Sequence, residues 1–301
     1  MPVDFSKLDV TLSDFDWLRL RYSTSAADQA QWRELSAAAE ALGRRNTVNA
    51  QRAVRERGLK LSYRGDGCFG SEACEWVVRT DRVAERFSSW GEFNAAWREA
   101  MPVVRGYLAA VAQGENQVRL LTGTGAVDKE LKARSARDQM LRSSLSSGNL
   151  RLTSPALSAF RLAIGLHISR TDRSNTEWLS RLVERAGWPT SPGVTPEGRA
   201  AAWLLVVHAR HDPAFRLRAL DAVGRADQDG RITLADMATK TDHILSEVTG
   251  LQRYGTKGDC IAGRFVPAPS EKPEVVPRLR REVGLPTLEE QAEMMRPACS
   301  P

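Results

Sequence analysis

The sequence predicts an all-α fold. Apolar residues recur at helical spacing in nearly every segment, helix-capping residues precede several of these segments, and glycines follow several of them. Thr195, Pro196 and Glu197 are an example, since they supply a cap, a proline at the first helical position and an acid in the first turn. With 301 residues, 42% of them hydrophobic, the chain can bury a core. We expect a helical amino-terminal region over residues 1–120 and a second helical domain over 127–301.

The amino-terminal region should contain several helices. Residues 1–24 are expected to form an ordered tail packed on helices, although the alternating polarity of 17–22 also fits a short strand. Two helices are expected next, over 26–42 and 47–57, ended by Gly43 and Gly58. Ser71 can cap a third helix. A long fourth helix is expected over 90–113, with Pro102 as a kink or break.

The middle of the chain contains the expected domain boundary, between residues 115 and 127. Residues 121–125 include a Gly-x-Gly that we interpret as a linker, because the other elements of a dinucleotide site are missing. A charged helix over 128–145 and a serine-rich loop over 143–149 should follow. Pro155 opens the next helix, and Ser174 is expected to cap another that ends at Gly187.

The carboxy-terminal domain is predicted to hold more helices, a glycine-rich loop and an extended proline-rich arm. Helices should begin at Thr195, Asp212 and Thr233, and a capping box of Thr287 and Glu290 should begin the last one. The loop, residues 250–258, carries three glycines, so one fixed shape would cost much conformational entropy. Its polar side chains are therefore candidates for function. The arm spans 267–277 and leads into an arginine-rich helical turn at 278–281.

Composition narrows the possible partners and location. The net charge is +6 and the pI is about 9.4, but basic and acidic residues are mixed along the chain, which disfavours nucleic-acid binding. No apolar run is long enough to span a membrane, and residues 1–20 show no signal-peptide pattern. We expect a cytoplasmic protein without a membrane partner. Cys68 and Cys74 are close enough to form a bridge, which leaves open a secreted protein whose leader has been removed.

Neither a metal nor another cofactor is predicted. His208 and His211 have a spacing that can hold one metal, and Asp242 with His243 could complete the site. Such histidines more commonly bond backbone or core partners. Cys260 could act as a nucleophile with His208 or His243 as the base, but a lone cysteine does not establish catalysis.

Residues 227–236 resemble part of a calcium-binding loop. A cation, Arg225, would stand at the first ligand position, and the last ligand would be Asp236 in place of a bidentate glutamate. A polar turn between helices is therefore the favoured interpretation.

A series of polar, aromatic and glycine positions runs through the second half of the chain. They are Asp138, Gln139, Arg142, Asp172, Asn175, Gly187, Trp188, Pro189, Ala202, Trp203, His208, Asp212, Pro213, Ala214, Phe215, Asp242, Gln252, Tyr254, Gly255, Thr256, Arg280, Arg281, Gly284 and Leu285. In the order and spacing of these residues, the segment from about 138 to 288 resembles a bacterial family, domain of unknown function 6624. The resemblance implies no established reaction, but it indicates which residues belong together.

Four positions depart from the pattern of that family. Where the family usually has Gln, Gln, Arg and Gln, this chain has Val207, Arg216, His243 and Lys257. These substitutions change polar positions close to the expected site and can abolish or redirect an activity shared with the family.

We expect a polar pocket in the carboxy-terminal domain. His208 would be the acid or base, because its reference pKa lies close to neutral, and Asp242 would orient it or bind a cationic group. Tyr254 completes the predicted catalytic set. The predicted ligand-binding residues are Gln252, Thr256, Lys257, Trp188, Arg280 and Arg281.

Three functional hypotheses follow. The first is a hydrolase or transferase that uses His208 on an amide or acyl group of a small molecule or peptide. The second is a protein-interaction or ligand-binding module without catalysis, in which the same residues lock the loop to the helices. The third is a secreted effector or toxin whose amino-terminal region directs delivery.

Overall fold

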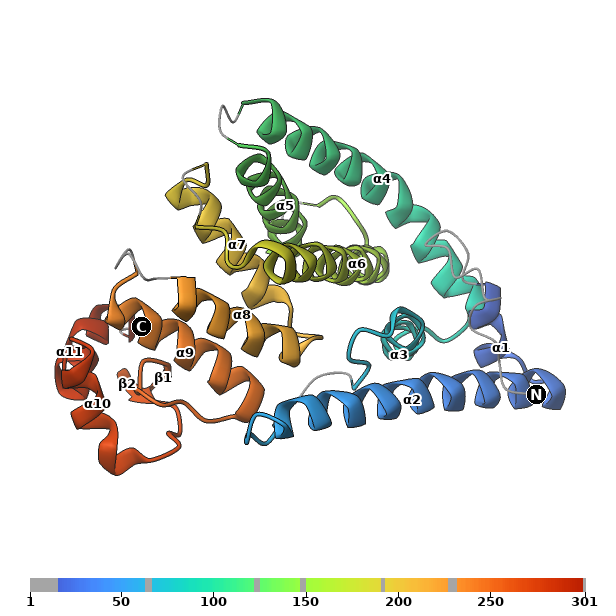
Figure 1. Cartoon of the computed structure of the whole chain (residues 1–301). Coiled ribbons are helices and arrows are strands. Elements are labelled where there is room, and N and C mark those ends of the chain that lie inside the picture. Colours follow the sequence, from blue (N-terminus) through green and yellow to red (C-terminus); the bar gives the residue numbers. More distant parts are fainter. Residues whose placement is uncertain are drawn as a thin grey trace. The chain divides into compact units, whose positions relative to one another are not determined.

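The computed structural model describes residues 16–62, 67–121, 125–146, 150–190, 193–226 and 232–299 (Figure 1). Within these ranges the chain forms eleven α-helices and one two-stranded sheet, which confirms the all-α class. It folds into two compact units. The first contains residues 1–49, 65–179 and 189–211, and the second contains 50–64, 180–188 and 212–301. The boundary predicted from the sequence, between 115 and 127, stays a prediction. Most of the Gly-x-Gly linker, the end of the serine-rich loop and calcium-loop residues 227–231 lie outside the described ranges.

The first unit is built on an aromatic core. Phe93, Trp97, Trp76 and Phe160 are buried together, and Leu18 joins them from the amino-terminal tail. That tail is helical, so it packs as expected and does not form the alternative strand. The elements of this part of the chain are a 3₁₀ helix at Asp16–Leu18, α1 Arg19–Tyr22, α2 Ala26–Arg55, α3 Glu72–Ala84, α4 Trp90–Leu121, α5 Ala126–Ser143, a 3₁₀ helix at Ser144–Ser146, α6 Ser154–Ala186 and α7 Pro196–His208.

Three predicted helix boundaries in this part of the chain are wrong. Helix α2 continues through Gly43, so the two expected helices are one. A Cβ at Gly43 would lie 2.8 Å from the Gly67 carbonyl oxygen and 3.1 Å from the Cys74 sulfur, so this glycine permits close packing within a helix. Helix α6 likewise continues through Ser174, and α4 passes Pro102 and ends at Leu121. Favourable packing of long helical faces outweighs such local signals.

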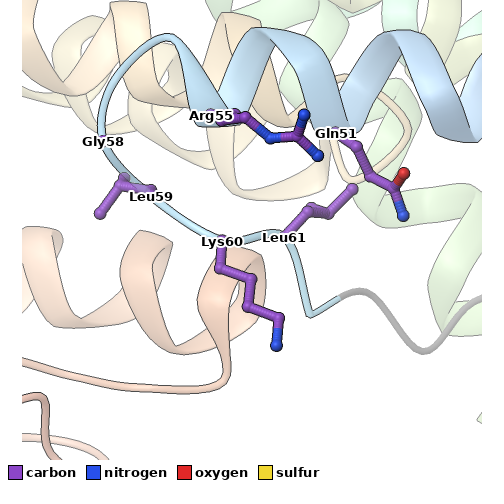
Figure 2. A pocket seen from close by; sticks show the side chains of 6 residues that line it. All are labelled: Gln51, Arg55, Gly58, Leu59, Lys60 and Leu61. Carbon is purple, nitrogen blue, oxygen red and sulfur yellow. The ribbon is translucent and has the colours of Figure 1, made fainter.

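Helix α2 ends just before Gly58, the glycine that the sequence predicted to end it. Gly58 has a φ of 71°, its amide donates to the Arg55 carbonyl at 2.8 Å, and the Leu59 amide donates to the Val54 carbonyl at 3.2 Å. These two bonds form a Schellman motif, in which a left-handed glycine closes the helix. The chain then turns back beneath the last turns of the helix (Figure 2), and the Ser62 amide donates to the Val248 carbonyl at 2.8 Å.

The second unit combines three full helices, a short helix and a hairpin that the sequence did not reveal. The two strands are antiparallel, with Gly258 opposite Pro267 and Ile261 opposite Arg264. Both turn residues, Ala262 and Gly263, have positive φ, as a type I′ hairpin turn requires. The elements are α8 Pro213–Ala226, α9 Leu234–Thr249, β1 Gly258–Ile261, β2 Arg264–Pro267, a 3₁₀ helix at Pro273–Val275, α10 Val276–Glu282 and α11 Leu288–Cys299.

All four cysteines are in disulfides. Cys68 pairs with Cys74, as the sequence allowed, and both are buried. Cys260 on β1 pairs with Cys299 at the end of α11. The hypothesis that Cys260 is a nucleophile is therefore wrong for this form of the protein, because its sulfur is already bonded. Among the described helices, none combines the length and the apolar character that a bilayer crossing requires.

Candidate functional site

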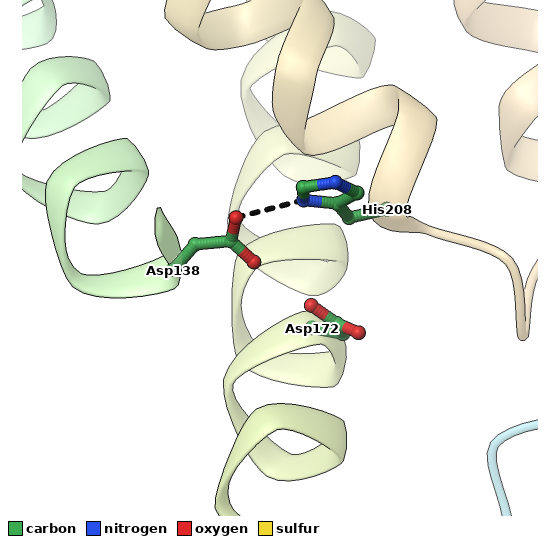
Figure 3. Close-up of side chains that lie close together, drawn as sticks. All are labelled: Asp138, Asp172 and His208. Carbon is green, nitrogen blue, oxygen red and sulfur yellow. Dashed lines mark hydrogen bonds and ion pairs between the residues drawn. The ribbon is translucent and has the colours of Figure 1, made fainter. Parts of the chain in front are cut away.

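Three helices of the first unit bring one histidine and two aspartates together. Asp138 lies on α5, Asp172 on α6 and His208 at the end of α7 (Figure 3). One potential ligand atom of each side chain lies within 4.8 Å of the others. Asp138 is buried, whereas the side chains of Asp172 and His208 are 15% and 18% exposed. Solvent therefore reaches one side of the cluster.

The packing of α5 against α7 places His208. At the start of α5, the buried Asp128 accepts hydrogen bonds from the backbone amide and the hydroxyl of Thr195, each at 2.8 Å. Thr195 also caps α7, as the sequence predicted. Asp138 and His208 then meet near the other ends of the same two helices, so α5 and α7 run in the same direction. The two contacts fix the register of the pair.

Asp138 is the centre of the hydrogen bonding. Its Oδ2 lies 2.7 Å from His208 Nδ1 and accepts from Gln139 Nε2 at 2.9 Å, while its Oδ1 accepts from Arg142 Nε at 3.1 Å. An ionised carboxylate can only accept, so Nδ1 of His208 carries a hydrogen. The other ring nitrogen, Nε2, points away from Asp138 in Figure 3. In the neutral imidazole this Nε2 is unprotonated and can accept a proton.

Arg142 joins the two carboxylates. Its Nε bonds Asp138 and its NH2 bonds Asp172 at 2.6 Å. Arg142 and Asp138 are four residues apart on α5, the spacing that places an ion pair on one helix face. Burial alone lowers the pKa of the guanidinium, but the charges and hydrogen bonds of Asp172 and Asp138 outweigh it and hold the pKa above its usual value.

The environments of the two carboxyls shift their pKa values in opposite directions. Burial alone raises the pKa of Asp138, but its bonds and charge interactions with His208, Arg142 and Gln139 hold it below its usual value. Burial also raises the pKa of Asp172, and the neighbouring Asp138 adds to this. Arg142 offsets only part of the effect, so the Asp172 pKa lies at about 7. One carboxyl is thus ionised at neutral pH, while the other changes protonation there.

The cluster also has the donor types of a metal site. A histidine and two carboxylates can hold a divalent cation. Here, however, the Arg142 guanidinium already bonds both carboxylates, and both oxygens of Asp138 accept hydrogen bonds. His211, the partner that spacing alone suggested, is not part of the group of three; its ring carbon Cδ2 would lie 3.2 Å from a Cβ added at Gly70. The cluster thus contains the groups of an acid–base network as well as the donor types of a metal site.

The glycine-rich loop of the second unit is held by Asp242 of α9. Oδ1 of this fully buried carboxylate accepts from the amides of Arg253 and Tyr254 at 2.7 and 2.9 Å. Its Oδ2 accepts from the amide and hydroxyl of Thr256 at 2.8 and 2.9 Å. Four donors leave Asp242 little capacity for a ligand. Its predicted catalytic role stays a prediction, and so does that of the half-buried Tyr254.

Gln252 fixes the other side of the same loop. Its Oε1 accepts from the Lys257 amide at 2.8 Å, and its Nε2 donates to the carbonyls of Lys257 and Ala268 at 2.9 and 2.7 Å. The side chain is fully buried. Both ends of its amide are therefore used within the protein, which explains how a segment with three glycines keeps one shape.

The sequence model of a family of unknown function, DUF6624, matches residues 126–300. This chain belongs to that family. No curated protein and no solved structure matches it significantly. The matched part of this DUF6624 member includes both the Asp138 cluster and the Asp242 loop.

Three of the four positions predicted to depart from the family pattern lie together. Lys257 Nζ is 3.0 Å from His243 Nδ1, and His243 Nε2 is 3.6 Å from a carboxylate oxygen of Glu247. The other Glu247 oxygen accepts from Arg216 NH2 at 2.7 Å. An ammonium can only donate, so Nδ1 accepts and Nε2 carries the hydrogen. In this DUF6624 member the three positions therefore form one connected set of contacts around Glu247. The fourth, Val207, precedes His208 on α7.

The remaining predicted ligand-binding residues have different surroundings. Trp188 is buried; it follows α6 in the sequence and comes directly after Gly187, whose backbone has a positive φ. Arg280 is also buried, and it donates to the carbonyls of Pro286 and Tyr254 and to the side chain of Gln291. Arg281 is exposed. Their roles in ligand binding stay predictions, although the bonds of Arg280 are those of a structural residue.

The predicted site residues thus divide between the two units. His208 belongs to the first unit, and Asp242, Gln252, Tyr254, Thr256, Lys257, Trp188, Arg280 and Arg281 belong to the second. The sequence interpretation missed Asp138 and Asp172 as members of the His208 cluster. Both carry the family resemblance, and that was the signal that could have included them.

Proposed function

We propose that this DUF6624 member is a hydrolase or transferase that acts on an amide or acyl group, with His208 as its general base. The observation that carries the proposal is the 2.7 Å contact between His208 Nδ1 and the buried Asp138 carboxylate. A carboxylate at Nδ1 selects the tautomer with an unprotonated Nε2 and stabilises the imidazolium that forms when Nε2 takes a proton. Gln139 and Arg142 keep that carboxylate oriented and ionised.

The proposed reaction needs no group beyond water or an acceptor hydroxyl. His208 Nε2 takes a proton as the oxygen of that molecule forms a bond to the acyl carbon. The bond from the acyl carbon to nitrogen or oxygen then breaks, and the leaving atom takes a proton back. The donor is the His208 imidazolium or protonated Asp172, whose pKa of about 7 keeps it partly protonated at neutral pH. When Asp172 donates, it regains its proton from the imidazolium through water, which closes the cycle.

A small panel of chromogenic acyl substrates tests this function. We expect the full chain to hydrolyse p-nitrophenyl butyrate or an acyl p-nitroanilide, with activity unchanged by EDTA. His208→Gln and Asp138→Asn should each reduce kcat/KM by about 10²-fold or more, the usual contribution of general acid–base catalysis. His211→Gln is the matched control, since His211 is a partly buried histidine outside the cluster. If the His208 and Asp138 variants keep wild-type activity, or lose no more than the control, the proposal fails.

The hydrogen bonding of the second unit supports the alternative of a non-catalytic ligand-binding or interaction module. The side chains of Asp242, Gln252 and Arg280 form hydrogen bonds with backbone groups of the glycine-rich loop and of the segment that follows it. Under this alternative, residues predicted to act on a substrate instead stabilise a surface. A His208→Gln variant that loses thermal stability while no substrate of the panel is turned over at all would favour it.

The two disulfides support a location in an oxidising compartment, where such bonds persist. This favours the secreted form of the protein, including an effector or toxin, over the cytoplasmic expectation. Thiol counting on protein purified from native cells tests the point. We expect no free thiols; four free thiols would support the cytoplasmic location. Growth inhibition by the exported chain, but not by its His208→Gln variant, would support the toxin.

A further inference from the structure

The end of α2 and the loop after it line a pocket of about 420 Å³ that is open to solvent, within the second unit. This volume lies in the usual range of small-molecule sites. Its lining residues are Gln51, Arg55, Gly58, Leu59, Lys60 and Leu61. They include two cations, one amide and two leucines, and no carboxylate (Figure 2).

The shape of the cavity is fixed by the backbone. The Schellman bonds of Gly58 and Leu59 hold the loop to the helix, and the amide of Ser62 holds it to α9. The same bonds satisfy carbonyls of the last helical turns, since Val54 accepts from Arg57 and Leu59, and Arg55 accepts from Gly58. This matters because free carbonyls at a helix carboxy terminus repel anions.

Two of the polar side chains, those of Gln51 and Arg55, converge on one side of the loop. Gln51 and Arg55 are four residues apart, so they project from the same face of α2. In Figure 2 their polar ends lie near each other, and the Leu61 side chain rises toward both. Lys60 extends away from the helix and contributes its positive charge from the other side. Within the described part of the chain, neither the Arg55 nor the Lys60 side chain forms a hydrogen bond or an ion pair.

We propose that this cavity binds a small anion, a carboxylate or phosphate carried on a short apolar group, with Arg55 and Gln51 as its direct donors. The planar guanidinium presents paired N–H groups that match the oxygens of a carboxylate or phosphate. The Gln51 amide adds a neutral donor, and Leu61 and Leu59 provide the apolar wall. Lys60 raises the local positive potential. The site shares no residue with the His208 cluster, so the proposal does not depend on the activity of that cluster.

An NMR titration of the ¹⁵N-labelled full chain tests the proposal. Sodium hexanoate and inorganic phosphate are titrated at constant ionic strength, and hexanamide serves as the uncharged counterpart of hexanoate. We expect saturable shifts of the Gln51 side-chain amide and of the Gly58 and Leu59 backbone amides with both anions. Hexanamide should not produce them. If hexanoate binds much more tightly than phosphate, the ligand is an apolar carboxylate; the reverse order identifies a phosphate ligand.

Charge-neutralising variants make the test specific. Arg55→Gln should weaken binding by about tenfold or more, as expected for the loss of charge-assisted hydrogen bonds, and Lys60→Gln should weaken it less. Arg52→Gln is the matched control, because Arg52 is an exposed arginine on the same helix outside the lining. The absence of saturable shifts, or equal weakening by Arg52→Gln and Arg55→Gln, would overturn the proposal. Activity toward the acyl substrates should be unchanged in all three variants.

Discussion

Replacing Asp172 by asparagine should change how the stability of this protein depends on pH. The Asp172 side chain is 15% exposed and lies beside Asp138, and the folded protein raises its pKa from 3.8 to about 7. Asparagine has nearly the same shape but carries no charge at any pH. The variant therefore removes the ionisation of this one group and keeps the packing between α5 and α6.

The sign of the effect follows from proton binding. Because its pKa is higher in the folded than in the unfolded chain, Asp172 contributes stability that is complete below about pH 3.8 and is lost as the pH rises to about 7. The size follows from the width of this window, since each pKa unit corresponds to about 1.4 kcal/mol, which gives on the order of 4 kcal/mol. Asp138 contributes in the opposite direction, because its pKa is lowered in the folded protein.

Urea unfolding of the disulfide-intact protein at several pH values between 4 and 8 measures this difference. We expect the free energy of unfolding of Asp172→Asn, relative to the wild type, to rise by on the order of 4 kcal/mol between pH 4 and pH 8. Asp259→Asn is the control, because Asp259 is exposed on β1. If the curves of Asp172→Asn and wild type stay parallel over this range, Asp172 does not have the raised pKa, and its role as a proton donor fails with it.

Two further predictions concern the second unit. Asp242→Asn should lose at least two of the four hydrogen bonds that Asp242 accepts, because the NH₂ group of asparagine would face N–H donors. Each bond to a charged group contributes about 1.5–3 kcal/mol. Hydrogen exchange at the amides of Arg253, Tyr254 and Thr256 should therefore accelerate by at least 10²-fold. Unchanged protection there would contradict the role of Asp242 as the anchor of the loop. The Cys260→Ser, Cys299→Ser double variant opens a loop of 39 residues and should lose about 4 kcal/mol of stability, measured by urea unfolding against wild type. An equal urea midpoint would show that the hairpin and α11 need no covalent link.

The local parts of the fold could be predicted because their causes are local. Thr195 caps α7, Thr287 and Glu290 exchange both bonds of a capping box, and Gly250 closes α9 in the left-handed conformation. Each of these depends on neighbours within a few residues along the chain. Gly43 gave the wrong signal because its reason is tertiary, namely the approach of the Gly67 carbonyl and the Cys74 sulfur. The hairpin was missed because an Ala-Gly pair is a weaker turn signal than Asn-Gly.

The candidate site was less predictable than the fold. His208 could be chosen from its chemistry alone, whereas Asp138 and Asp172 were only among the residues that carry the family resemblance. Their convergence required the packing of three helices, since Asp138 and His208 are 70 residues apart. Likewise, only the tertiary structure shows that Asp242 and Gln252 use their hydrogen-bonding groups within the loop. A sequence carries the identity and local spacing of its polar groups, whereas burial and long-range contacts decide which of them remain able to bond a ligand.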